Sequence, residues 1–197
     1  MRRFALTFAI FGIAQVVSAQ PPTRAQIEEA IAHGSTGDTY GTETVGTVRP
    51  GNYLVILSGP MGRISGIAHQ RAKAYKPFAV ADVPADAAAP ELTVGAYPAT
   101  PSFENGEVIQ APLAEEVLLQ PHGVTDAAVT RRPLRQEKEP KTWSNAMGAQ
   151  YRGVEIHASF PLSVLHELPP GDIDVVILTD GDELRYTLPE AKRKRIE

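Results

Sequence analysis

The stretch from 151 to 188 shows the most regular alternation of hydrophobic and polar residues in the chain. Its first part has the period of two that is typical of a strand with one buried face. The apolar positions are Val154, Ile156, Ala158 and Phe160, and the polar positions between them are Glu155, His157 and Ser159. This pattern predicts a strand whose polar side chains lie together on one side of a sheet.

A β-hairpin is predicted after that strand. Pro169-Pro170-Gly171 interrupts the chain, and a run rich in β-branched residues follows from 173 to 179. Asp180-Gly181 is a two-residue turn signal, and residues 184–188 resume the alternation. Three strands this close in sequence can form the nucleus of an antiparallel sheet.

Two amphipathic helices are expected in the first half of the chain. Thr23 and Gln26 have the spacing of a capping box, so the first helix is predicted over 24–33, with Gly34 at its C-terminal cap. Apolar residues at helical intervals predict a second helix over 63–75.

Short strands separated by Pro, Gly or Asn are expected elsewhere. The unbroken apolar run 53–57 predicts a strand buried on both faces, whereas 34–51 indicates a loop or weak edge strands. Later candidates are strands over 92–97, 107–110, 116–120 and 127–132, a charged stretch over 135–141 and a loop over 142–148. This pattern favours a mainly β fold, an immunoglobulin-like antiparallel β-sandwich. The alternative is an α+β fold with helices packed on one face of an antiparallel sheet.

The N-terminus has the features of a secretory signal peptide. Arg2 and Arg3 precede an apolar stretch shorter than the ~20 residues of a membrane span, and Ala19 suits cleavage. We therefore expect residues 1–19 to be removed, which leaves no transmembrane span in the mature chain. The rest is expected to divide into an N-terminal segment with two helices and a buried strand (20–89), a β-sandwich domain (90–190) and a basic tail (191–197).

Composition narrows the location and the class of partner. The 197 residues carry a net charge of -4 and include no cysteine. The lack of cysteine excludes disulfides and thiolate chemistry, and a disulfide-free secreted protein suits a bacterial periplasm or exterior. The acidic charge argues against nucleic acid, since proteins that hold phosphate backbones concentrate positive charge. The expected partner is an unknown protein or cell-envelope ligand.

Glu155 and His157 are the candidate catalytic residues. Side chains at i and i+2 of a strand share one face, where a carboxylate and an imidazole can share a proton or a metal ion. Nothing local supplies a third ligand or a nucleophile on a constrained turn. Alternating polar residues are also what a solvated sheet face shows.

Gly62 and Arg63 are the candidate residues of an anion site at the start of the second helix. Free backbone amides and the helix dipole attract negative charge there. However, the stretch has neither P-loop nor GxGxxG spacing. The simpler interpretation is a tight connection between strand and helix.

Acidic residues gather around the final hairpin, and the candidate calcium ligands are Asp180, Asp182 and Glu183. Their spacing does not match an EF-hand loop, and the turn itself requires Asp-Gly. Basic residues gather over 131–141 and 192–195, where we expect a solvated edge strand and a disordered tail.

The sequence holds no complete catalytic constellation. We interpret the chain as a secreted, non-enzymatic β-sandwich module that binds a ligand or protein partner through its loops, without a cofactor. One alternative is a metal-dependent or His/Glu hydrolase built on Glu155 and His157. Another is a structural envelope or assembly protein, which would expose an apolar patch or an unpaired edge strand.

Overall fold

The structure is a computed structural model that describes residues 20–38, 40–144 and 150–196. The expected signal peptide, residues 1–19, lies outside the described residues, as does the 145–148 part of the expected loop. Strands form 40% and helices 22% of the structure, and the sheets are antiparallel. The prediction of a mainly β fold is therefore confirmed. Among the described helices, none combines the length and apolar character needed to cross a membrane.

Helices and strands follow one another along the chain. The first half contains α1 (Arg24–Thr36), β1 (Thr42–Gly46), β2 (Tyr53–Ser58), α2 (Pro60–Lys73), η1 (Val80–Asp82), β3 (Glu91–Pro98), β4 (Ser102–Glu104) and β5 (Glu107–Ile109). The second half contains β6 (Ala114–Pro121), β7 (Arg135–Ser144), β8 (Gln150–Pro161), α3 (Val164–Glu167), β9 (Ile173–Thr179), β10 (Glu183–Leu188) and α4 (Glu190–Arg193).

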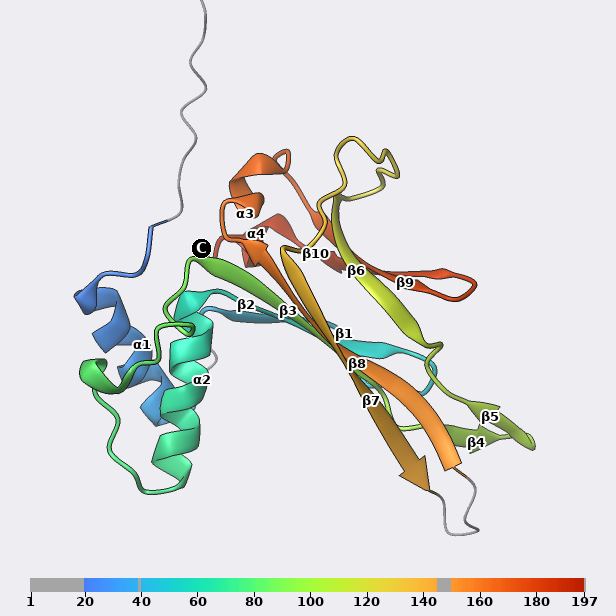
Figure 1. Cartoon of the computed structure of the whole chain (residues 1–197), viewed down its shortest axis with the longest axis horizontal. Helices are drawn as coiled ribbons and strands as arrows, with labels where there is room; N and C mark the ends of the chain where they lie inside the picture. The colour runs from blue at the N-terminus through green and yellow to red at the C-terminus, as the bar shows by residue number, and fades with distance from the viewer. Residues whose placement is uncertain (1–19, 39, 145–149, 197) are drawn as a thin grey trace, which may run out of the picture.

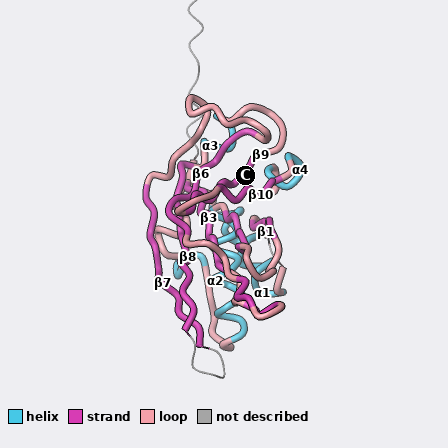
Figure 2. The backbone as a smooth tube through the Cα atoms, turned by 90° about the vertical axis from the view of Figure 1, so that its right-hand side faces the viewer, coloured by secondary structure: helices cyan, strands magenta, loops and turns pink. Residues whose placement is uncertain are grey.

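The strands form two larger sheets and one small hairpin. The order is β1-β2-β3-β8-β7 in the five-stranded sheet and β10-β9-β6 in the three-stranded sheet, and β4 pairs with β5. The three-stranded sheet lies over one face of the five-stranded sheet (Figure 1), and Figure 2 shows the long β7–β8 pair at one edge of the molecule. Because β2 pairs with β3, strands from both sides of residue 90 belong to one sheet.

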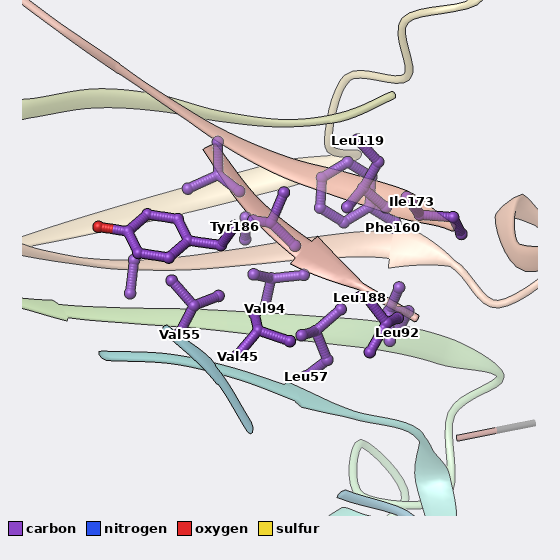
Figure 3. Packing of buried hydrophobic residues seen from close by; sticks show 14 of the residues in the cluster. Val45, Val55, Leu57, Leu92, Val94, Leu119, Phe160, Ile173, Tyr186 and Leu188 are labelled. Carbon is purple, nitrogen blue, oxygen red and sulfur yellow. The ribbon is translucent and has the colours of Figure 1, made fainter. Parts of the chain in front are cut away.

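One hydrophobic core fills the space between the two larger sheets (Figure 3). The five-stranded sheet contributes Val55, Leu57, Val94 and Phe160, and the three-stranded sheet contributes Leu119, Ile173 and Leu188. Each of these side chains is at most 1% exposed. Full burial of a side chain of this size contributes about 1.5–3 kcal/mol. The core therefore fixes which face of each strand points inward.

Helices α1 and α2 pack against each other at one end of the five-stranded sheet (Figure 1). Their apolar residues form a cluster separate from the core between the sheets. At their crossing, a Cβ atom placed on Gly34 would lie 2.2 Å from the carbonyl oxygen of Ser65. Gly34 is therefore a packing position inside helix α1 and not its expected C-terminal cap. The helix ends at Thr36 and is capped by Gly37, whose φ of 92° is left-handed.

Several expectations for the second half of the chain are corrected. The segment 127–132, expected as a strand, is a loop that makes one isolated bridge between Arg131 and Leu119. The expected disordered tail is packed: Ile196 is fully buried, and Arg193 donates a hydrogen bond of 3.0 Å to the carbonyl oxygen of Leu168. Two short helices, α3 and α4, also show that helices are not confined to the N-terminal segment.

Candidate functional site

The outer face of the five-stranded sheet, which points away from the three-stranded sheet, carries both candidate catalytic residues. Successive side chains of a strand point to opposite faces, so Glu155 and His157 lie outward while the residue between them enters the core. On this face His157 lies between Gly95 of β3 and Glu137 of β7, and Glu155 lies beside Glu139 of β7. The expectation that Glu155 and His157 share one face of a strand is confirmed.

Glu155 is the centre of a polar cluster on this face. Its carboxylate accepts a hydrogen bond of 2.8 Å from His157 Nε2 and lies 3.0 Å from Lys141 Nζ. Lys141 Nζ also lies 2.9 Å from Glu139, so one ammonium group bridges carboxylates on two adjacent strands. The side chain of Glu155 is 14% exposed. Burial opposes ionisation, but the hydrogen bonds from Lys141 and His157 outweigh it and lower the pKa of Glu155.

Two aromatic rings lie against glycines of the same face. Tyr97 meets the ring of His157 edge-on, with ring centroids 5.5 Å apart. A Cβ atom placed on Gly95 would lie 2.7 Å from the Tyr97 ring, and one placed on Gly153 would lie 2.8 Å from the Trp143 ring. Only glycine lets each ring approach the sheet this closely. Burial raises the pKa of Tyr97, so its hydroxyl group stays protonated near neutral pH.

A cavity of about 200 Å³ opens on this face, where the segment 84–91 approaches the strands. Its lining combines charged and hydroxyl side chains: Arg63, Asp86, Glu91, Thr93, Arg135, Glu137, His157 and Ser159. Arg135 and Glu91 form a bidentate ion pair with distances of 2.9 and 2.6 Å. Through His157 the cavity adjoins the Glu155 cluster.

Arg63 lies beside this cavity, but its donors are engaged within the chain. Its guanidinium group donates hydrogen bonds to the carbonyl oxygens of Ala87 at 3.2 Å, Ala89 at 2.5 Å and Glu91 at 2.6 Å. These bonds hold the segment 87–91 against helix α2. Burial lowers the pKa of Arg63. Arg63 therefore has a structural role here: it fixes the segment 87–91 by hydrogen bonds to its backbone.

Gly62 is enclosed at the start of helix α2. A Cβ atom placed there would lie 2.3 Å from both the carbonyl oxygen of Gly41 and the hydroxyl oxygen of Thr42. The beginning of β1 thus occupies the space beside the first turn of α2. The expected anion-site pair is split, because Arg63 reaches the outer face whereas Gly62 packs against β1.

The Glu155 cluster contains parts of a proton relay. His157 is oriented by Glu155, and Ser159 is the next outward hydroxyl group on β8. Within the part of the chain that the structure describes, no hydrogen bond joins Ser159 to His157. A carboxyl group with a lowered pKa is ionised near neutral pH and accepts hydrogen bonds instead of donating a proton. Near neutral pH, Glu155 is therefore a hydrogen-bond acceptor on this face and not a proton donor.

The expected calcium ligands lie at the β9–β10 turn. The carbonyl oxygen of Asp182 accepts a hydrogen bond of 3.0 Å from the N–H of Thr179, and Glu183 pairs with Arg185 at 2.7 Å. Within residues 20–38, 40–144 and 150–196, no group of three or more acidic or histidine side chains is placed to hold a metal ion. The structure thus does not gather Asp180, Asp182 and Glu183 into a metal site.

A second polar network, which sequence reasoning misses, lies on the outer face of the three-stranded sheet. The side chain of Asp174 is 3% exposed and lies 2.9 Å from His122 Nδ1. It also accepts a hydrogen bond of 2.9 Å from the hydroxyl group of Thr187, and Arg185 lies 3.7 Å away. The signal in the sequence is Asp174 itself, because an acidic residue inside an apolar strand needs buried partners.

Another cavity, of about 710 Å³, lies between α1, β1 and the C-terminal residues. Its basic side chains are paired within the protein. Lys192 and Arg195 each lie 3.3 Å from Glu43, and Lys194 lies 3.2 Å from Glu190. Among the described residues, these three cations therefore share two carboxylates, those of Glu43 and Glu190.

We refer to Tyr97, Lys141, Trp143, Glu155 and His157 as the outer-face site. Sequence reasoning finds only Glu155 and His157, because the other three residues belong to neighbouring strands. A usable signal for the aromatic pair is the glycine beside each ring, since glycine inside a strand marks close approach. No family model, curated protein or solved structure matches this chain, so the site is interpreted from its geometry.

Proposed function

We propose that this protein is a secreted, non-enzymatic binding module that presents the outer-face site to a cell-envelope ligand or a protein partner. The observation that carries the proposal is the Lys141–Glu155–His157 cluster, held beside Tyr97 on a sheet face next to an open cavity. Ligand sites combine such fixed polar groups with aromatic walls. The proposed contact surface is a sheet face, in place of the loops expected from the sequence.

We further propose an immunoglobulin-like sandwich for the scaffold. The order β2-β3-β8-β7 in one sheet and β6-β9-β10 in the other supports this assignment. It corresponds to the A-B-E-D and C-F-G orders of constant-type immunoglobulin domains, and the order along the chain also agrees. Strand β1, helix α2 and the β4–β5 hairpin would then be additions to the seven-stranded scaffold.

Secretion is proposed from the N-terminal sequence and the lack of cysteine. N-terminal sequencing of the protein recovered from a periplasmic fraction tests it, and a mature chain that begins near Gln20 is expected. Recovery of the intact Met1 terminus in the cytoplasmic fraction would contradict this part of the proposal.

The hydrolase alternative has one observation in its favour, the hydrogen bond between Glu155 and His157. Assays with chromogenic ester, phosphoester and glycoside substrates separate the two functions. The binding module is expected to show no turnover that depends on His157. A rate that falls at least about a hundredfold in His157→Gln would favour the hydrolase.

The binding proposal is tested by NMR titration of the secreted protein with cell-envelope fragments. We expect chemical-shift changes centred on β3, β7 and β8. The variant Glu155→Gln is expected to weaken binding, whereas the matched control Glu183→Gln, on β10 of the other sheet, leaves binding unchanged. Shift changes confined to the loops or to the three-stranded sheet would contradict the outer-face assignment.

A further inference from the structure

We propose that the ligand of the outer-face site is an uncharged glycan chain, which is bound and not cleaved. This inference rests on the proposed function, because it names the chemical class of the ligand at that same site. It follows from three features of the outer face: its excess of hydrogen-bond acceptors, its aromatic rings, and the ion pairs that hold its carboxylates.

The hydrogen-bonding groups of the face complement a ligand rich in hydroxyl groups. Carboxylate oxygens accept hydrogen bonds, and the outer face carries three such side chains on the adjacent strands β7 and β8, at Glu137, Glu139 and Glu155. Ser159 and Thr93 add hydroxyl groups in the adjoining cavity. Sugar hydroxyl groups donate to carboxylates without bringing a negative charge. These three carboxylates and Glu91 outnumber the cations of the same face, which are Lys141, Arg135 and Arg63. A polyanion, such as nucleic acid or an acidic polymer, would therefore meet an excess of negative charge.

The aromatic rings complement the apolar faces of pyranose rings. Sugars present C–H groups on their faces and hydroxyl groups at their edges, so protein sites pair an aromatic face with polar groups beside it. Tyr97 and Trp143 provide the rings, and the glycines beneath them let both rings lie close to the strands. Polar groups lie beside these rings, because Lys141 is on β7 with Trp143, and Glu155 is on β8 with Gly153.

The ion pairs of the site favour binding over hydrolysis. Glycoside hydrolysis requires one carboxylic acid that donates a proton to the leaving oxygen and a second carboxylate on the other side of the bond. Lys141 contacts both Glu139 and Glu155, at 2.9 and 3.0 Å. Against the opposing effect of burial, its hydrogen bond, together with that from His157, lowers the pKa of Glu155, so Glu155 is not suited to donate a proton near neutral pH.

Isothermal titration calorimetry of the secreted protein tests the inference with three probes. These are a β-linked glucose tetramer, an N-acetylglucosamine tetramer and an acidic oligosaccharide that contains glucuronate. We expect at least one uncharged tetramer to bind and the acidic one to bind at least about tenfold more weakly. The two uncharged probes distinguish a plain glucan from an acetamido glycan.

Matched variants locate the contact. Tyr97→Ala and Trp143→Ala are expected to weaken binding at least about fivefold each, because each removes a stacking ring. Tyr97→Phe keeps the ring and is expected to retain most of the affinity. Tyr75→Ala is the control, because Tyr75 is 97% exposed on another part of the molecule. NMR spectra of each variant verify that the sheet remains folded.

Three outcomes would overturn the inference. In the first, neither uncharged tetramer binds, but another envelope fragment changes the NMR chemical shifts of β3, β7 and β8 and this change is lost in Glu155→Gln. The assignment of a glycan ligand is then wrong, whereas the proposed binding module stands. If no ligand perturbs this face, both proposals fail. If the bound tetramer is shortened during incubation, the site cleaves its ligand and the claim of binding without cleavage is wrong.

Discussion

The backbone N–H of Tyr53 donates a hydrogen bond of 2.9 Å to the hydroxyl oxygen of Tyr186, and this contact joins the two sheets inside the core. Tyr53 lies on β2 of the five-stranded sheet and Tyr186 on β10 of the three-stranded sheet. The Tyr53 hydroxyl group donates in turn to the carbonyl oxygen of Pro112 at 2.8 Å. Burial raises the pKa of Tyr53 to about 12, so the phenol stays protonated and continues to donate.

The substitution Tyr186→Phe is expected to lower the free energy of unfolding by about 1–3 kcal/mol. It keeps the ring but leaves the buried N–H of Tyr53 without its acceptor, and an unsatisfied buried donor carries that cost. Urea unfolding of the variant measures the loss. The exposed Tyr75→Phe serves as the control and should match the parent. A Tyr186→Phe stability within a few tenths of the parent value would show that the contact is dispensable.

Two glycines of helix α2 are expected to respond in opposite ways to alanine. Gly62→Ala should destabilise the protein, because the new Cβ atom would lie 2.3 Å from atoms of Gly41 and Thr42. Gly66→Ala should stabilise it by about 0.5–1 kcal/mol, because the space beside Gly66 is open and alanine favours the helix. Thermal unfolding of both variants measures the difference. An equal gain at both positions would contradict the packing of β1 against the first turn.

The His122–Asp174 pair makes stability depend on pH. The hydrogen bond to Asp174, followed by the attraction of its charge, raises the pKa of His122 above 6.5. Burial opposes ionisation of Asp174, but the hydrogen bonds from His122 and Thr187 outweigh it and lower its pKa below 3.8. The stabilisation of the fold by His122 is complete below pH 6.5 and is lost as pH rises through the folded-state pKa of His122. The stabilisation by Asp174 is present above pH 3.8 and is lost as pH falls through the folded-state pKa of Asp174.

The pair is therefore expected to stabilise the fold most between the ordinary pKa values of 3.8 and 6.5. His122→Gln keeps a donor for Asp174 but does not titrate, so it should remove part of the decline in melting temperature above about pH 6.5. Melting curves of the variant and the parent between about pH 5 and about pH 9 test this. The control His69→Gln, on helix α2, should keep the parent profile. An unchanged profile in His122→Gln would refute the linkage.

Pro140 is expected to protect the edge of the five-stranded sheet. It lies within β7, the edge strand, and has no N–H for another chain to pair with. Pro140→Val restores that donor and adds a residue that favours strands. As protein concentration rises, the variant should therefore self-associate more than the parent protein does. Sedimentation velocity measures it. Thr142→Val, on the same strand with the proline kept, should remain at the parent mass. Equal masses for all three proteins would argue against protection by Pro140.

Local sequence determined the elements whose signals lie within a few residues. The capping box of α1 forms as predicted, since Thr23 N–H donates to Gln26 Oε1 at 2.8 Å and Gln26 N–H donates to Thr23 Oγ1 at 3.4 Å. The period of two in β8 and the Asp180-Gly181 turn between β9 and β10 also form as predicted. Such signals depend on backbone geometry and on neighbours in sequence, so no distant contact is needed to read them.

Only the tertiary structure decided how these elements combine into a site. Strand β7 is charged and lacks an apolar face, so pairing with β8 is what makes it a strand. That pairing brings Lys141 to Glu155, and the pairing of β3 with β8 brings Tyr97 to His157. The partners come from separate segments, and sheet register sets their distances. The register is fixed when the core between the two sheets packs, and the pattern within one strand does not specify which residue of another strand it will face.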